Sequence, residues 1–172
     1  LVTCGDTPLV TKETFTALID CHEQSGAAAT VLTAHMPDPT GYGRVIRDEK
    51  GQVVKIVEQK DGTPEELAVD EVNVTNDNAQ GEYYLTDIIG MLVSAGKVVS
   101  AFAAPSYAET LGVNSRQQMA EAERVLRQRK LDELMTAGVS IIDPNNTYVD
   151  TTVTVGRDTV LYPGTILEGD TV

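Results

Sequence analysis

Tryptophan is absent from this sequence, and phenylalanine, histidine and cysteine occur twice each in 172 residues. Two cysteines, Cys4 and Cys21, are too few for a disulfide scaffold or a zinc site, and their scarcity fits a reducing, cytoplasmic setting. Basic residues are also scarce: 13 Lys and Arg oppose 26 Asp and Glu, a net charge of −13. This excess of acid, without an aromatic or basic platform, argues against a nucleic-acid partner.

Long hydrophobic runs are missing as well. No apolar stretch approaches the roughly 20 residues of a membrane span, and no charged segment precedes a signal-like apolar region. Hydrophobic residues nevertheless make up 41% of the sequence, enough for a buried core. The first residues already have the pattern of a strand, so we expect the chain to be part of a longer protein.

The first third of the sequence has an α/β pattern. Residues 1–4 form a short apolar run, and Thr11 caps a predicted helix that Gly26 ends. Residues 28–34 form a second apolar run. Strand, helix and strand at this spacing predict a βαβ unit and a largely parallel sheet.

The middle of the sequence predicts further strands and short helices. Residues 41–58 contain two β-rich runs around a polar turn, which is typical of a hairpin. Thr63, followed by Glu66, has the spacing of a capping box. An amphipathic helix is predicted over residues 87–95 and a strand over 98–102.

The last third combines a long helix with a short repeat. Asn114 or Ser115 is expected to cap a helix that runs to about residue 137, with one apolar and one charged face. Beyond it, aliphatic residues recur every six positions, at Val149, Val155, Leu161 and Leu167. A six-residue aliphatic period is the signature of a parallel β-helix.

Four positions carry candidate chemistry, each with an ordinary structural alternative. Asp6 follows a predicted strand and is suited to bind a hard cation, but an Asx turn before Pro8 is the commoner interpretation of that spacing. Gly43 offers close backbone approach to a ligand, or only a flexible start to the hairpin. Glu58 is either an acceptor for sugar hydroxyls or a solvated charge, and Asn114 is a helix cap, a cation ligand or both.

Several motifs, taken in order, resemble one family, the bacterial bifunctional GlmU enzymes, which join N-acetylglucosamine-1-phosphate uridyltransferase to glucosamine-1-phosphate acetyltransferase. The resemblance covers nearly the whole chain. The motifs are Gly5-Asp6-Thr7-Pro8-Leu9, Gly41-Tyr42-Gly43-Arg44-Val45, Ile56-Val57-Glu58-Gln59-Lys60-Asp61, Asn76-Asp77-Asn78-Ala79-Gln80-Gly81-Glu82-Tyr83-Tyr84-Leu85-Thr86-Asp87 and Gly112-Val113-Asn114-Ser115-Arg116.

This resemblance implies a fold and a set of domains. The fold is α/β, a Rossmann-like (GT-A-like) nucleotidyltransferase domain followed by a long arm helix and the first coils of a left-handed parallel β-helix. Residues 1–113 would be the later part of the uridyltransferase domain, 114–138 the linker helix and 139–172 the start of the acetyltransferase β-helix. The family's β-helices are trimeric, so a homotrimer is expected.

The resemblance also implies an activity. The family makes UDP-N-acetylglucosamine and pyrophosphate from UTP and N-acetylglucosamine 1-phosphate with Mg²⁺, for peptidoglycan and lipopolysaccharide synthesis, in the cytoplasm. Asp6 and Asn114 match its metal ligands, and Asn114 also counts among the substrate-binding positions. Gly43 matches a backbone contact to the substrate, and Glu58 and Asn73 match side chains that hold the N-acetylglucosamine moiety. Acetyl-CoA would be a substrate of the acetyltransferase part.

The sequence departs from the family at three places. The Gly-rich loop that holds UTP and most of the acetyltransferase repeats are not in this sequence. In the family, a strand and a helix follow the position of Asn73, whereas here Asn73-Val74-Thr75 runs directly into the Asn76 motif. These residues are either deleted or left out of the sequence, and omission is favoured because a deletion would remove a strand beside the sugar pocket.

We therefore expect the 172-residue chain by itself to be inactive. The competing hypotheses are a non-catalytic piece that binds sugar phosphate or trimerises through its β-helix, and a related glucose-1-phosphate nucleotidyltransferase.

Overall fold

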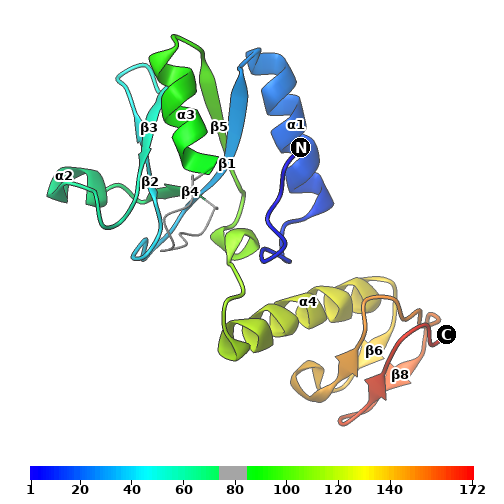
Figure 1. Ribbon diagram of the computed structural model, residues 1–172. Coiled ribbons are helices and arrows are strands. Elements are labelled where there is room, and N and C mark those ends of the chain that lie inside the picture. The colour runs from blue at the N-terminus through cyan, green and yellow to red at the C-terminus, as the bar shows by residue number, and fades with distance from the viewer. Residues whose placement is uncertain (74–84) are drawn as a thin grey trace. The chain divides into compact units, whose positions relative to one another are not determined.

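The computed structural model of the chain describes residues 1–73 and 85–172 and divides them into two compact units, Leu1–Gly112 and Val113–Val172 (Figure 1). The positions of the two units relative to one another are not determined. The motif at residues 76–84 lies outside the described residues. No helix of the described part combines the length and the apolar character that crossing a membrane requires.

The first unit is built on a mixed five-stranded sheet with the order β3-β2-β4-β1-β5. Its strands are β1 (Ala29–His35), β2 (Arg44–Arg47), β3 (Val53–Val57), β4 (Glu71–Asn73) and β5 (Val99–Ala103). Only β1 and β5 pair in parallel, whereas β1–β4, β2–β4 and β2–β3 are antiparallel. The prediction of a largely parallel sheet is therefore wrong, because short connections such as the β2–β3 turn can join only antiparallel neighbours.

Residues 1–4 do not form the predicted strand, and the predicted βαβ unit therefore does not form. Leu1 and Val2 are 77% and 80% exposed, and Cys4 is exposed too. A strand is stable only when a neighbouring strand satisfies its backbone hydrogen bonds. None of the described strands pairs with this segment.

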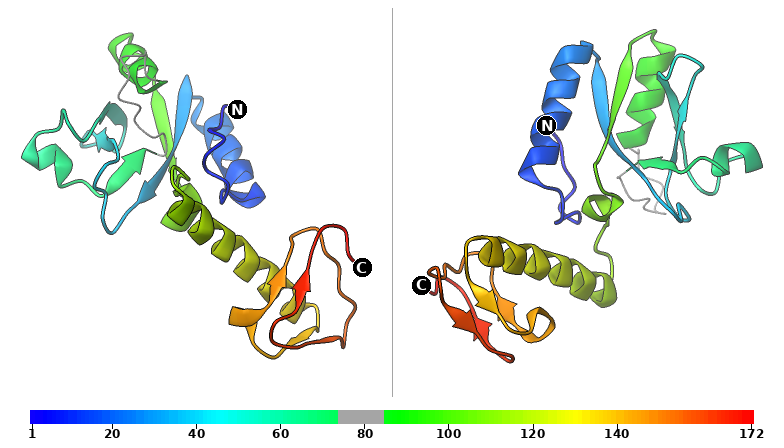
Figure 2. Two further views of the ribbon diagram at one scale, coloured as in Figure 1. Left: turned by 60° about the horizontal axis from the view of Figure 1, so that its bottom comes forward. Right: turned by 180° about the vertical axis from the view of Figure 1, so that it is seen from behind.

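Helices α1 (Lys12–Ser25) and α3 (Leu85–Ser94) cover opposite faces of β1 and β5 (Figure 2). The α1 side chains of Cys21 and His22 approach Ser100 and Thr30, at even-numbered strand positions. Helix α3 packs into a cluster that includes Val31 and other odd-numbered strand positions. Because strand side chains alternate between faces, the helices must lie on different sides of the sheet.

The ends of α1 follow the sequence. Thr11 accepts a hydrogen bond from the Thr14 backbone N–H, and Gly26 ends the helix with φ of +58°, a conformation that favours glycine. The buried carboxylate of Glu109, in the 3₁₀ helix η1 (Tyr107–Thr110), completes this cap. It accepts from the Thr14 hydroxyl at 2.6 Å and from the Thr11 N–H at 3.1 Å. The predicted start and end of the helix are thus confirmed.

Other local predictions are confirmed as well. The hairpin forms from β2 and β3, and its turn contains Gly51 with φ of +78°. Thr63 and Glu66 form a reciprocal capping box at α2 (Pro64–Leu67). Ser115, not Asn114, caps α4 (Arg116–Thr136), because its hydroxyl accepts from the Gln118 backbone N–H at 3.1 Å.

The second unit packs α4 against short paired strands. These strands are β6 (Ser140–Ile141), β7 (Tyr148–Val149), β8 (Val160–Leu161) and β9 (Ile166–Leu167), and η2 (Pro144–Asn146) lies between β6 and β7. Strands β6 and β8 pair in parallel, as do β7 and β9. The four aliphatic residues of the six-residue period all join one cluster with Leu131 and Leu134 of α4. Burying a side chain as completely as Leu131 stabilises the fold by roughly 2 kcal/mol.

Candidate functional site

Three residues predicted to contact a sugar lie together in one row across the sheet. Because Arg44 of β2 pairs with Val57 of β3, Gly43 lies opposite Glu58. The backbone N–H of Asn73, the last residue of β4, donates to the carbonyl of Gly43 at 2.9 Å. Positions 43, 58 and 73 are thus brought together by strand register. Their role in binding remains a prediction.

Gly43 has little room for a side chain. A Cβ atom at this position would lie 3.2 and 3.3 Å from the two carboxylate oxygens of Glu58, and 3.2 Å from Cγ2 of Ile56. These separations are tighter than most real Cβ contacts, so either Glu58 or the hairpin would have to shift. Glycine therefore allows the Glu58 carboxylate to lie directly against the start of β2.

Asn73 presents an amide to the inside of the unit. It is 2% exposed and pairs in register with Thr33 of β1. It also lines a largely apolar cavity of about 610 Å³, together with Ile56 of β3 and Ile89 of α3. A buried amide at the wall of a cavity can both donate to and accept from a bound group.

A pair of side chains that the sequence analysis missed holds the backbone next to Gly43. The Arg44 guanidinium donates to the carbonyl of Tyr42 and, at 2.9 Å, to Oε1 of Gln59. The same Gln59 oxygen accepts from the Gly41 backbone N–H at 3.2 Å. We call Arg44 and Gln59 the hairpin clamp. Both residues stand in motifs that carry the family resemblance, and each directly follows a predicted sugar-site residue.

The hairpin clamp is deeply buried on the arginine side. Arg44 is 2% exposed, and its Nε–H has no hydrogen-bond partner among residues 1–73 and 85–172. Burial also raises the pKa of the Tyr42 phenol above its ordinary value, because a phenolate is poorly solvated there. The phenol therefore stays neutral over the whole physiological pH range.

Asp6 lies in a turn rather than at the end of a strand. The turn is held by the Thr7 hydroxyl, which donates to the Cys4 carbonyl at 3.2 Å. Within the described part of the chain, the half-buried Asp6 carboxylate makes no hydrogen bond or ion pair, so an Asx turn is not observed. Its oxygens remain available to a ligand.

Asn114 is the second residue of the second unit and is exposed. Its backbone N–H donates to Oε1 of Gln118 at 2.8 Å, and its side-chain amide has no partner among the described residues. A carboxylate and an amide oxygen are both ligands that Mg²⁺ accepts, so Asp6 and Asn114 fit the predicted ion chemically. They belong to different units, and their convergence therefore stays a prediction. In the described ranges, no group of three or more His, Cys, Asp or Glu side chains is arranged for a metal.

Known proteins match the chain over its whole length, although no protein-family model does. "Bifunctional protein GlmU" of Geobacillus sp. (strain WCH70) is 51% identical over 189 aligned positions, which include all of this chain and 41% of that protein. GlmU of Geobacillus thermodenitrificans (strain NG80-2) gives the same identity and shares. GlmU of Lactobacillus johnsonii is 50% identical over 99% of the chain and 41% of its own length. The chain thus spans about two-fifths of the length of these relatives.

The alignments are longer than the chain itself. The 189 aligned positions exceed the 172 residues of the chain by 17, so at least 17 positions of the Geobacillus relative have no counterpart here. The alignment length agrees with the expectation that the family contains extra residues.

Proposed function

The chain is a relative of the bifunctional GlmU proteins along its whole length, and on that premise we propose that it carries the sugar-binding part of a uridylyltransferase site. The reaction transfers uridylyl from UTP to N-acetylglucosamine 1-phosphate and gives UDP-N-acetylglucosamine and pyrophosphate. The observation that carries the proposal is the row of Gly43, Glu58 and Asn73, which strand register brings together from three separate segments.

The row has the chemistry that a sugar requires. The carboxylate of Glu58 accepts hydrogen bonds from sugar hydroxyls, and the Asn73 amide pairs with an N-acetyl or hydroxyl group. Gly43 keeps the wall next to Glu58 free of side-chain bulk. The hairpin clamp of Arg44 and Gln59 fixes the backbone next to Gly43, so that less conformational entropy is lost when a sugar binds.

Phosphate binding involves other residues. Asp6 and Asn114 would hold Mg²⁺, since both offer oxygens without described partners. When bound, the ion neutralises charge on the phosphate groups during uridylyl transfer. The site also needs residues that hold the nucleotide, and these are expected in the Gly-rich loop that this sequence lacks.

The second unit is proposed to begin a left-handed parallel β-helix, the acetyltransferase part of the bifunctional enzyme. Two features support this proposal: the parallel pairing of β6 with β8 and of β7 with β9, and the shared core of the six-residue repeat. A homotrimer built on such coils, with acetyl-CoA as a further substrate, completes the proposal. The two free cysteines agree with a cytoplasmic setting.

A binding experiment with the 172-residue chain tests the sugar site. Isothermal titration calorimetry with N-acetylglucosamine 1-phosphate is expected to show saturable binding, which Glu58→Ala weakens about tenfold or more. Glu65→Ala, which removes an exposed carboxylate from α2, is the matched control and should bind like the wild type. Absence of saturable binding, or equal losses in both variants, would overturn the proposal.

Two further arms separate the competing functions. With UTP, the sugar phosphate and Mg²⁺, the chain alone is expected to release no pyrophosphate, and measurable release would contradict the non-catalytic alternative. Glucose 1-phosphate in place of the N-acetyl sugar should bind more weakly. If it binds more tightly, the glucose-1-phosphate enzyme is the better assignment.

A further inference from the structure

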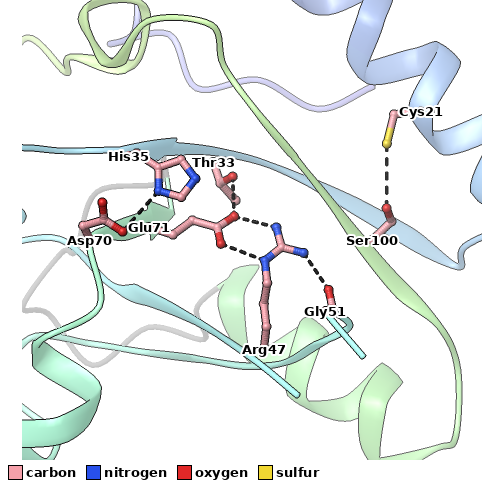
Figure 3. A network of polar contacts seen from close by, with 8 residues as sticks. All are labelled: Cys21, Thr33, His35, Arg47, Gly51, Asp70, Glu71 and Ser100. Carbon is pink, nitrogen blue, oxygen red and sulfur yellow. Dashed lines mark hydrogen bonds and ion pairs between the residues drawn. The ribbon is translucent and has the colours of Figure 1, made fainter. Parts of the chain in front are cut away.

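Glu71 is a buried carboxylate that none of the roles above uses. It is 6% exposed and lies between Thr33 of β1 and Arg47 of β2 (Figure 3). Its Oε1 accepts from the Thr33 hydroxyl at 2.8 Å and from the Arg47 guanidinium at 2.6 Å. Its Oε2 accepts from Nε of Arg47 at 2.7 Å. One side chain of β4 is thus bonded to both neighbouring strands.

This arrangement keeps a charge inside the unit. Burial on its own raises the pKa of Glu71, but hydrogen bonds from Arg47 and Thr33 outweigh it, and the pKa lies below its ordinary value. The same pairing raises the pKa of Arg47. A buried ion pair often adds little net stability compared with apolar residues, whereas removing one partner is costly. Its more distinctive effect is to fix geometry.

Strand β4 is short and is held less firmly on its β2 side. All three of its residues pair with β1, whereas its described pairing to β2 is a single register position, Arg44 with Val72. Asn73 lies two residues after Glu71, on the same face of the sheet. Thr33 is both the register partner of Asn73 and a donor to Glu71. The carboxylate therefore ties β4 to β1 directly beside the Asn73 position.

Arg47 extends the tie to the hairpin. While two of its nitrogens bind Glu71, its third donates to the carbonyl of Gly51 in the β2–β3 turn at 2.8 Å. The hairpin carries Gly43 and Glu58 at its open end, and β4 carries Asn73. The network of Thr33, Glu71 and Arg47 consequently links the segments that form the sugar row.

We infer that Glu71 is a positioning residue for the proposed sugar site: through Thr33 and Arg47 it holds β4 so that Asn73 stays beside Gly43 and Glu58. This inference rests on the proposed function. It concerns a group that need not touch the sugar, and it predicts that loss of the Glu71 charge weakens sugar binding by displacing Asn73.

The first test needs no ligand. The Asn73 N–H donates to Gly43 across β4 and β2, while the Ala104 N–H donates to the Thr33 carbonyl at 2.8 Å and reports on the same unit. In Glu71→Gln, hydrogen exchange at Asn73 should accelerate more than exchange at Ala104. Equal acceleration at both amides would mean that Glu71 only stabilises the unit, and no acceleration would mean that it does not hold β4. Either result overturns the inference.

The second test measures N-acetylglucosamine 1-phosphate binding to the 172-residue chain by calorimetry, at a temperature where each variant is folded. Glu71→Gln should weaken binding about tenfold or more, because small displacements of binding groups are costly. The matched control is Glu66→Gln, which breaks the 2.5 Å ion pair between Glu66 and Lys55 in the same unit. That ion pair joins α2 to β3 and does not involve β4. Glu66→Gln should leave the affinity unchanged.

The outcomes separate the inference from the proposed function. If the wild-type chain does not bind the sugar phosphate, the proposed function fails and the inference falls with it. If the wild type binds and Glu71→Gln binds equally well, the inference alone is wrong. If Glu71→Gln does not fold, Thr33→Val is the second variant, because it removes only the hydroxyl that donates to Glu71. It must show the same selective loss of hydrogen-exchange protection at Asn73 and the same loss of sugar-phosphate affinity. Normal protection or normal affinity in this variant overturns the inference.

Discussion

The β2–β3 hairpin and the first residues of the chain both contain short apolar runs but have different structures. Val45 and Val53 of the hairpin are 1% and 3% exposed, whereas Leu1 and Val2 are 77% and 80% exposed. The hairpin finds its partner strand within a few residues, and residues 1–4 find none among the described strands. An apolar run therefore predicts a strand only where a pairing partner exists.

Asp6→Ala is expected to have the largest effect. It tests whether the N-terminal segment, which pairs with no described strand, contributes to the reaction. Joined to the nucleotide-binding part that the site needs, the variant should release pyrophosphate about 100-fold more slowly, since a charge that stabilises the transition state is lost. The free energy of unfolding should change little, as Asp6 has no described partner in the chain. Enzyme assays and chemical denaturation of the variant and of Asp20→Ala, an exposed control, measure both quantities. Parallel losses of activity and stability would make Asp6 a structural residue.

Two glycine substitutions, one in the hairpin and one in the N-terminal segment, compare the two regions and should have smaller effects. Gly43→Ala places a Cβ 3.2 Å from the Glu58 carboxylate and should weaken sugar-phosphate binding about tenfold. Gly5→Ala, in the N-terminal segment, meets no atom within 4 Å and should bind normally. Calorimetric titration of the two variants side by side measures the difference. Equal affinities would show that the close approach at Gly43 is not needed.

Acidification should lower the stability that the Glu71 carboxylate gives to the hairpin side of the unit. The folded-state pKa of Glu71 is depressed, so its contribution to stability is complete above the ordinary carboxyl value of 4.5 and is lost as pH falls through the lower folded-state value. Urea denaturation between about pH 6 and about pH 3 should show this loss. The free energy of unfolding should fall less steeply with decreasing pH in Glu71→Gln than in the wild type. An identical slope in the variant would remove Glu71 from the account of acid stability.

Local features were predictable because their causes lie within a few residues. Thr11 and Gly26 mark the ends of α1, and Thr63 with Glu66 forms the capping box. The direction of the strands was not predictable in this way. Pairing of β4 between β1 and β2 depends on contacts between residues far apart in sequence, which composition and periodicity do not encode.

The site shows the same division. Gly43, Glu58 and Asn73 came from a family resemblance, and the register of the sheet brings them together. Gln59, Arg44 and Glu71 were missed, because a buried polar network is recognisable only once its members are placed in space. The pairing of Asp6 with Asn114 still depends on how the two units meet.

The carboxylate of Glu109 has a consequence for how the chain acquires its structure. It completes the cap of α1 from a position 95 residues beyond Thr14. During synthesis from the N-terminus, the opening turn of α1 stays incompletely bonded until η1 has left the ribosome. Helix α1 is thus made well before its cap is completed, and the completed cap requires the closure of a long loop.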